Sequence, residues 1–315
     1  MEAYEYFVYY LMAPTVFALG LMGNMTALVV FFKGNLKNIG PVLIYRLMFI
    51  FDTLFIIQII LFYLQYPFYL DITILSRLSC KLVVYLNYQM DAISSYLLVY
   101  ISLEKYISIN NPSKRRILNS KKNQIIFFIS ILVFCTSYNI GDLFFFDIFE
   151  YNQTDSNGTN NSYSRCQPIN YEAQLISSVL DLINREILPG SLMILFSFML
   201  VLAVFRSSSR MAHSINDQNR RKRDVKLAVN CFFMNFMFIL LKTPISTAFF
   251  LPDIFSHNLI YYSVTYISFL SYGINFYIIF VCNSLFRKEL YRILRKKNLT
   301  TERNPTMNFI SGQII

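Results

Sequence analysis

The segment VYYLMAPTVFALGLMGNMTALVVFF, residues 8–32, runs for 25 positions without a charged side chain. A helix of about 20 apolar residues is long enough to cross the hydrocarbon core of a bilayer. Six further apolar runs follow at short intervals, at residues 47–70, 82–103, 125–146, 187–205, 227–251 and 259–282. Because backbone polar groups in lipid must be satisfied within each element, the pattern predicts an all-α membrane protein, a bundle of seven transmembrane helices.

The composition agrees with this fold class. The 315 residues are 55% hydrophobic and 15% charged, whereas a soluble domain has about 25% charged residues. The first run is too long for a cleaved signal peptide and has no basic segment before it, so we expect a permanent helix. The intervals between the runs are too short to hold independent soluble domains.

The distribution of basic residues predicts the orientation of the bundle. If residues 1–7 lie outside, the segments 33–46, 104–124, 206–226 and 283–315 lie inside, and they hold 23 of the 28 Lys and Arg residues. The outer segments hold four. This asymmetry predicts an extracellular N-terminus in a multi-pass protein of the plasma membrane. The net charge of +10 therefore comes mainly from basic segments that would face anionic lipid at the inner membrane surface. It does not indicate a nucleic-acid partner.

Two features of the predicted outer side support this orientation. The loop at residues 147–186 contains three glycosylation sequons, which begin at Asn152, Asn157 and Asn160, and such sequons are used on extracellular loops. Of the five cysteines, only Cys80 and Cys166 fall on the outer side. An oxidising compartment favours a disulfide between them.

Several short motifs follow one another in a distinctive order. They are Gly23-Asn24, Asp52, Cys80, Glu104-Lys105-Tyr106, Pro189, Phe238 with Pro244 six residues later, and Asn275-Phe276. In this order and spacing, residues 8 to 297 resemble the rhodopsin-like (class A) G-protein-coupled receptors. The resemblance implies an extracellular N-terminus (1–7), a seven-helix receptor domain (8–297) that includes a short amphipathic eighth helix (about 284–297), and a cytoplasmic tail (298–315).

The motifs also depart from the pattern of that family. Lys105 replaces its usual Arg, which keeps the charge but loses the planar fork that pairs with a carboxylate. Lys242 stands where the sixth helix usually has Trp, and Ile279 stands where the seventh usually has Tyr. The pair Asn275-Phe276 is similar to that of invertebrate neuropeptide receptors of the FMRFamide type.

The resemblance implies roles for polar residues inside the bundle. It implies a sodium site formed by Asp52, Ser94, Asn24 and Asn275. No other cofactor is expected. The alternative is an Asp52 carboxyl group that is satisfied by hydrogen bonds alone. It also implies that G-protein coupling and activation involve Glu104, Lys105, Tyr106, Asp224, Phe238, Pro244 and Asn275.

Charged residues at bilayer depth are rare and usually functional. The alignment places Asp91 and Lys242 opposite each other across the floor of the ligand cavity. We expect an ion pair that locks the inactive state. Two alternatives remain, a static structural pair and a Lys242 that reaches Asp52 in place of sodium.

The predicted outer segments hold ten acidic residues and four basic ones, which favours a cationic ligand. Asn87 stands where amine receptors have Asp, so an amidated basic peptide fits better than a small amine. The expected partners are an extracellular peptide or small-molecule ligand, a heterotrimeric G protein and membrane lipid. The candidate ligand contacts are Asn87, Tyr88, Gln89, Asp91, Glu186, Lys242 and Tyr266.

Other function classes have less support. A divergent receptor for another small ligand or an odorant would share the fold. A transporter would show internal repeats, which we do not find. An enzyme would need clustered catalytic side chains at lipid depth, and the two histidines, His213 and His257, fall in predicted loops. We therefore expect a receptor without catalytic activity.

Overall fold

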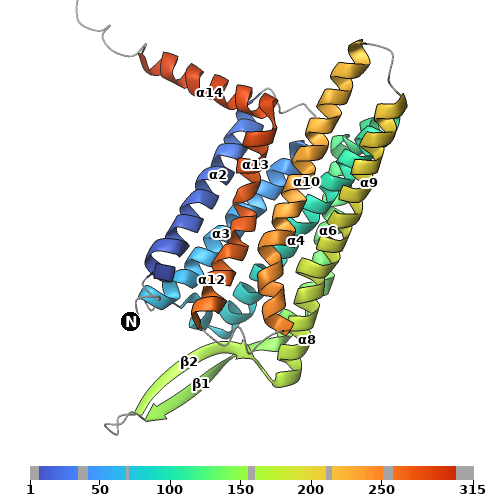
Figure 1. Cartoon of the computed structure of the whole chain (residues 1–315). Coiled ribbons are helices and arrows are strands. Elements are labelled where there is room, and N and C mark those ends of the chain that lie inside the picture. Colours follow the sequence, from blue (N-terminus) through green and yellow to red (C-terminus); the bar gives the residue numbers. More distant parts are fainter. Residues whose placement is uncertain are drawn as a thin grey trace, which may run out of the picture.

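The computed structural model describes residues 7–34, 42–68, 71–154, 160–210, 215–250 and 258–302. Long helices lie side by side in one bundle, and a two-stranded hairpin projects from one end (Figure 1). The N-terminus lies at that end, which we call the hairpin end. A separate helix, α14 (Ser284–Glu302), lies at the opposite end, which we call the tail-helix end. The predicted helical membrane bundle is confirmed.

The helices of the bundle correspond in order to the seven apolar runs. They are α2 (Ala13–Lys33), α3 (Val42–Phe68), α4 (Arg77–Asn110), α6 (Lys121–Asn139), α9 (Leu188–Arg210), α10 (Ile215–Phe250) and the pair α12 (Asn258–Phe269) and α13 (Ile274–Cys282). Within the described residues, five helices are long and apolar enough to span a membrane, or six if the bent pair α12 and α13 is one span.

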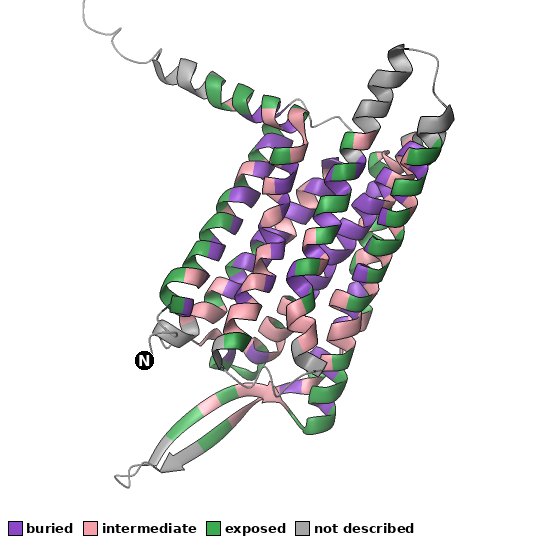
Figure 2. Ribbon diagram, in the orientation of Figure 1, coloured by how far each residue is buried: buried purple, intermediate pink, exposed green. Residues whose placement is uncertain are grey.

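The polar helix α4 lies at the centre of the bundle. It packs against α3, α6, α9 and α10, and its residues from Ala92 to Ser102 are all buried. Figure 2 shows the buried residues on the inner sides of the helices and the exposed ones on the outside. A helix enclosed by other helices does not face lipid, so α4 can carry polar and charged side chains that the outer helices cannot.

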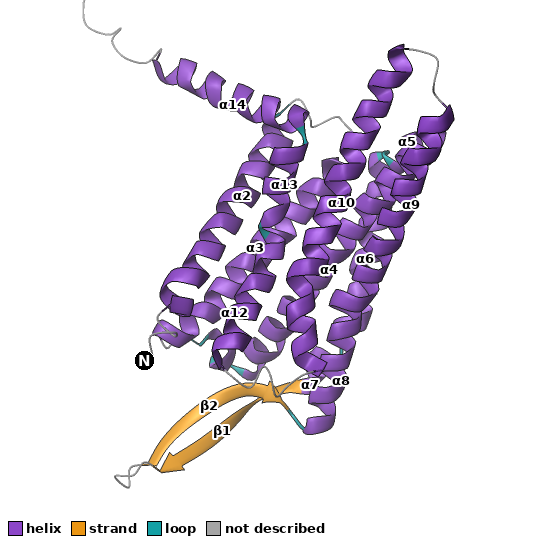
Figure 3. Cartoon of the chain, viewed as in Figure 1, coloured by secondary structure: helices purple, strands orange, loops and turns teal. Residues whose placement is uncertain are grey.

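The segment predicted as a loop at residues 147–186 is largely regular structure, so that prediction was wrong. It contains the antiparallel strands β1 (Phe146–Thr154) and β2 (Asn160–Pro168) (Figure 3). The helix α8 (Tyr171–Leu182) follows and continues through the π-helical turn η4 (Ile183–Ile187) into α9. The fifth helical segment therefore begins 16 residues earlier than the apolar run at 187–205, because amphipathic α8 packs on its neighbours rather than facing lipid on every side.

Two other predicted runs also differ from the structure. In the run at 125–146, the long helix ends at Asn139. A short helical turn, α7 (Asp142–Phe145), then leads into the hairpin. The run at 259–282 is divided by the 3-10 turn η5 (Leu270–Tyr272) and bends by 47°. Gly273 follows this turn, and a β-carbon there would lie 2.6 Å from the α-carbon of Gly20 on α2. The close approach of these two helices therefore requires glycine.

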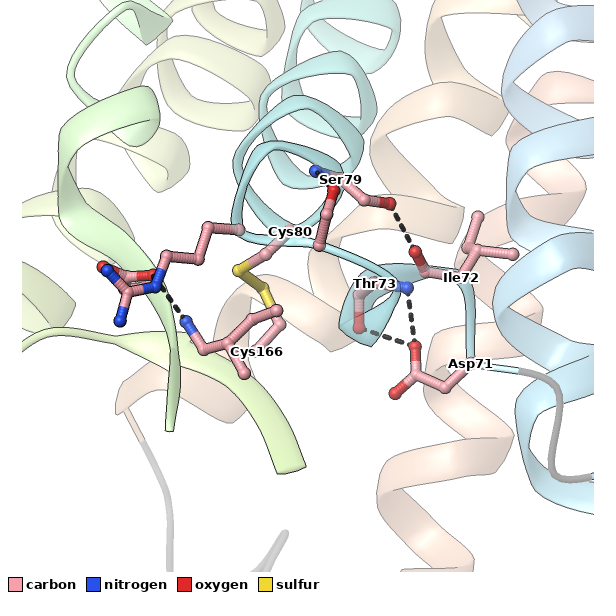
Figure 4. Close-up of a disulfide and its surroundings, with 10 residues drawn as sticks. Asp71, Ile72, Thr73, Ser79, Cys80 and Cys166 are labelled. Carbon is pink, nitrogen blue, oxygen red and sulfur yellow. Dashed lines mark hydrogen bonds and ion pairs between the residues drawn. A yellow bond between two sulfur atoms is a disulfide. The ribbon is translucent and has the colours of Figure 1, made fainter. Parts of the chain in front are cut away.

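The disulfide predicted between Cys80 and Cys166 is present and joins α4 to β2. Beside it, the turn η3 (Ile72–Ile74) is capped by Asp71, whose carboxylate accepts from the Thr73 backbone N–H at 2.8 Å (Figure 4). The Ser79 hydroxyl donates to the Ile72 carbonyl. The covalent bond and the capped turn together fix the hairpin over the end of the bundle.

Two candidate glycosylation sites, Asn152 and Asn160, lie towards the far end of the hairpin. Asn152 is near the end of β1 and Asn160 begins β2, whereas Asn157 lies outside the described residues. In the strand register, Asn152 is opposite Ser162 and Thr154 is opposite Asn160. The sequons are therefore far along the strands from the disulfide.

Further helices lie at the two ends of the bundle. The segment η1 (Phe7–Met12) begins the described chain at the other end, and α5 (Pro112–Leu118) follows α4. Helix α14 buries Phe286 and Leu290 against the bundle, and its opposite face is basic, as expected for an amphipathic helix on a membrane surface.

Candidate ligand-binding cavity

A cavity of about 1230 Å³ lies within the bundle towards the hairpin end. It is lined from η1, α3, α4, η4, α10 and α12. One wall is aromatic: the ring of Tyr9 lies 5.4 to 6.3 Å from those of Tyr63, Tyr262 and Tyr266. The other side of the cavity is charged, so one ligand would contact two chemically different surfaces.

The Asp91 carboxylate is the centre of the charged side. Its two oxygens accept from Lys242 Nζ at 3.0 and 3.2 Å, and Arg185 Nη1 donates to it at 2.9 Å. The Tyr272 hydroxyl also donates to this carboxylate. A buried carboxylate without such partners would cost several kcal/mol or become protonated. The four residues come from α4, α10, η4 and η5, so one buried group connects four elements.

The sequence predicted the pair of Asp91 and Lys242 but missed Arg185 and Tyr272. Arg185 is one of the four basic residues of the predicted outer segments, with Arg77, Lys81 and Arg165. A signal was present, because Arg185 stands four residues after Asp181, and a helix brings such residues together. The ammonium group of Lys242 also lies 4.6 Å above the ring of Tyr272, a further contact that spacing alone does not predict.

Most of the predicted ligand contacts line the cavity. They are Asn87, Tyr88, Asp91, Glu186, Lys242 and Tyr266. Gln89 is the exception, because it does not line the cavity. Its side chain is buried against α6, where it donates to Thr136 at 3.0 Å and accepts from Asn139 at 3.0 Å. These two contacts turn the Gln89 side chain towards α6 and away from the cavity that Asn87 and Tyr88 line.

A second polar cluster lies around Asp52 in the interior. Ser94 donates to Asp52, and the Asn275 amide donates to it at 3.5 Å. Asn24 donates instead to the Tyr272 carbonyl at 3.1 Å, and its own amide oxygen is buried without a hydrogen-bond partner. Lys242 contacts Asp91 and Tyr272, so the alternative in which it pairs with Asp52 was wrong.

A third cluster lies at the tail-helix end of α4. Glu104 accepts from Lys105 and Ser108, each at 2.7 Å, and from Asn119 at 3.2 Å. The ammonium group of Lys105 lies 5.8 Å from the centre of the Tyr45 ring. Both members of the ion pair are buried, which differs from the exposed pair common at helix ends.

The other residues predicted for coupling are distributed over the bundle. Phe238 is buried in the main hydrophobic core, and Pro244 lies inside α10. Tyr106 accepts from Asn110 at 3.4 Å. The side chain of Asp224 lies outside the described residues, although its backbone belongs to α10.

No curated protein matches the chain. The family model described as 7 transmembrane receptor (rhodopsin family) matches residues 23–261. This range covers more than half of the chain, from the Gly23-Asn24 pair on α2 to the start of α12, and includes both Asp91 and Lys242. The chain belongs to the rhodopsin family of seven-transmembrane receptors.

Proposed function

We propose that this receptor binds an extracellular ligand at the hairpin end and activates a heterotrimeric G protein at the tail-helix end. The hairpin end then faces outside and the N-terminus is extracellular, in the plasma membrane. The basic side chains of α14 and the positive-inside distribution of Lys and Arg support this orientation.

The observation that carries the proposal is the position of Asp91. It lines the cavity and also accepts from side chains on α10, η4 and η5. A ligand that competes for these donors would loosen contacts between helices that have to move during activation. In this proposal the pair of Asp91 and Lys242 locks the inactive state, and ligand binding opens it.

The ligand class that best fits the cavity is a peptide. A volume of about 1230 Å³ exceeds the ~300–1000 Å³ of most small-molecule sites. An acidic excess in the segments at the hairpin end favours a basic peptide. The Asn275-Phe276 pair, which is similar to FMRFamide-type receptors, supports an amidated neuropeptide.

The cluster around Glu104 is the proposed coupling switch. Lys105 is held by the adjacent carboxylate, and Asn119 extends the contact to the segment between α5 and α6. Release of Lys105 would open this end of α4 to a helix of the G protein. Tyr106, Phe238, Pro244, Asn275 and Asp224 complete the proposed activation set.

The sodium site that we propose is the Asp52 cluster, with Asp52, Ser94, Asn24 and Asn275 as its members. The Ser94 hydroxyl donates to Asp52, and the Asn24 amide oxygen is buried without a hydrogen-bond partner. The ion would balance the charge of the carboxylate, which is buried, and oxygen ligands are those that hard cations prefer. The thermal midpoint of the purified receptor would then be higher in sodium chloride than in N-methylglucamine chloride, and Asp52→Asn would remove this difference.

The test of function is a ligand screen in cells. Cells that express the chain with a promiscuous G protein are exposed to amidated basic peptides, and second-messenger release is measured. A peptide response that is lost in Asp91→Asn but kept in Arg77→Ala, which changes an exposed residue, supports the proposal. Silence towards every peptide, with normal surface expression, contradicts the peptide assignment.

A further inference from the structure

The guanidinium group of Arg185 lies in a site built for a cation. One terminal nitrogen donates to Asp91 at 2.9 Å, and the other pairs with Asp181 on the preceding turn. Its central carbon lies 4.8 Å above the ring of Tyr88. Two carboxylates and an aromatic face are the groups by which proteins bind a guanidinium ion. We call Asp91, Asp181 and Tyr88 the guanidinium cradle.

The π-helical turn η4 positions this cradle. A π turn closes hydrogen bonds between residues five apart and is frequent at functional sites. It places Asp181, Arg185 and Glu186 close together beside the cavity. The turn is anchored on its other side by Asn184, which accepts from Tyr96 at 3.1 Å and donates to Asn139 at 3.2 Å. These two bonds hold the turn to α4 and α6.

The charges at the cradle are not balanced. Among the residues that the structure describes, the carboxyl groups of Asp91, Asp181 and Glu186 lie around two cationic groups, those of Arg185 and Lys242. One oxygen of Asp181 and one of Glu186 are buried without a hydrogen-bond donor, and the Nε of Arg185 is buried without an acceptor. An uncompensated carboxylate away from water is unfavourable. The cluster therefore has room, in charge and in hydrogen bonds, for one more cation.

Access to the cradle comes from the cavity. Arg185, Glu186, Tyr88 and Asp91 all line it, and the side chain of Arg185 is 18% exposed. Lys242, in contrast, is 6% exposed and is held by Asp91 and Tyr272. Arg185 is therefore the cation that an entering ligand can displace first.

We propose that Arg185 is an autoinhibitory occupant of a cation-binding subsite, and that the ligand carries a guanidinium or ammonium group that takes its place in the cradle. Displaced Arg185 pairs with the free carboxylate oxygen of Glu186. Asp91 then exchanges a bond to η4 for a bond to the ligand. This inference rests on the proposed function only in taking the cavity as the ligand site.

The test uses two matched probes and the purified full-length chain in detergent. N-acetylarginine amide carries a guanidinium group, and N-acetylcitrulline amide replaces it with a neutral group of the same shape. The thermal midpoint is measured as each probe is titrated. A ligand at tenfold its Kd raises the ratio of folded to unfolded protein about 11-fold, so a specific site gives a saturating rise in the midpoint.

The expected result is a rise with the arginine probe and none with the citrulline probe. Arg185→Gln empties the cradle and should tighten binding of the arginine probe at least tenfold, whereas Asp91→Asn should abolish it. Glu172→Gln removes an exposed carboxylate from the same helical segment and should leave binding as in the unmodified chain. If Arg185→Gln does not fold, Arg185→Lys keeps the charge without the fork and should still tighten binding.

Three outcomes would overturn the proposal. They are equal binding of the two probes, no binding of either, and an affinity that does not increase when Arg185 is replaced. None of these measurements involves a G protein. A failure here therefore leaves the receptor function untouched, and a receptor that fails to couple in cells leaves the cradle untouched.

Discussion

Helix α4 carries two buried ion pairs that differ in one respect. Near the hairpin end, Asp91 pairs with Lys242, which is 151 residues away in the chain and lies on another helix. Near the tail-helix end, Glu104 pairs with Lys105, its immediate neighbour. The first pair connects helices, whereas the second mainly satisfies charges within one helix.

This difference determines what each pair can transmit. Breaking the pair of Asp91 and Lys242 changes how α4 and α10 are held together, and Asp91 is reached from the cavity. Breaking the pair of Glu104 and Lys105 changes local charge, and Asn119 and the Tyr45 ring of α3 can convey that change to other segments. A bistable contact between elements is the physical requirement for a switch. We therefore expect ligand control at Asp91 and a response to it at Glu104.

The largest effect that we expect comes from removing the two carboxylates separately. Asp91→Ala leaves Lys242 without a counter-charge in the interior and should destabilise the bundle by about 3–5 kcal/mol. Glu104→Ala should cost less, because the long side chain of Lys105 can turn towards water at the end of α4. Thermal midpoint and surface expression measure both. A Glu104→Ala variant that is the more damaged of the two would reverse the comparison.

The next effect concerns the partner cation. Lys242→Met leaves Asp91 bound to Arg185 and Tyr272, so the chain should fold. Without the ion pair the active state should become more favourable by about 1–3 kcal/mol, and signalling without ligand should rise. The double variant Asp91→Asn with Lys242→Met should be more stable than the sum of the single effects, because it removes both charges. Basal second-messenger release and the thermal midpoint are measured for all three. If the changes in stability of the two single variants add up to that of the double variant, and basal second-messenger release is unchanged, the pair is a static structural contact and not a lock.

A smaller effect is expected at the tail-helix end. Lys105→Arg keeps the charge, adds a planar group that can hold Glu104 and stack on Tyr45, and should stabilise by about 1 kcal/mol or less. The rise in thermal midpoint should be accompanied by lower basal signalling. A fall in the midpoint would mean that the guanidinium group does not fit beside Glu104.

The smallest effect should come from an exposed pair. Arg77 is 80% exposed and lies 3.7 Å from Asp147 at the base of the hairpin. Because water and salt screen such a pair, Arg77→Ala should change stability by no more than about 1 kcal/mol. Unfolding in low and high salt checks this. A loss of stability as large as that caused by Lys242→Met would mean that burial does not determine how much these ion pairs contribute.

The two ends of the molecule also differ in how well the sequence predicted them. At the tail-helix end, the Glu104-Lys105 pair could be read directly, since its members are adjacent. At the hairpin end, the sequence predicted the Asp91 and Lys242 pair from the family alignment but missed Arg185, Asp181 and Tyr272. Their approach depends on the π turn and on the bend at Gly273. Neither the π turn nor the bend produces a pattern of hydrophobic residues that could be recognised in the sequence.

The same limit explains the errors in the fold. Residues 147–186 contain few apolar residues in a row, so they were predicted as a loop, although they form β1, β2 and α8. A hairpin above the bundle is stabilised by pairing between its two strands and by the disulfide of Cys80 and Cys166. These are contacts between distant residues.

By itself, the sequence determined the order of the apolar helices and the presence of charges within the bundle, because hydrophobic length and charge are properties of residues that lie near one another in the chain. The disulfide could be predicted for a different reason, since Cys80 and Cys166 are the two cysteines of the predicted outer side. Only the tertiary structure decided which charges meet. Asp91 has three donors because a π turn, a bent seventh helix and α10 converge on it. That convergence depends on side-chain packing between elements. A shift of one residue along a helix would turn a different side chain towards Asp91.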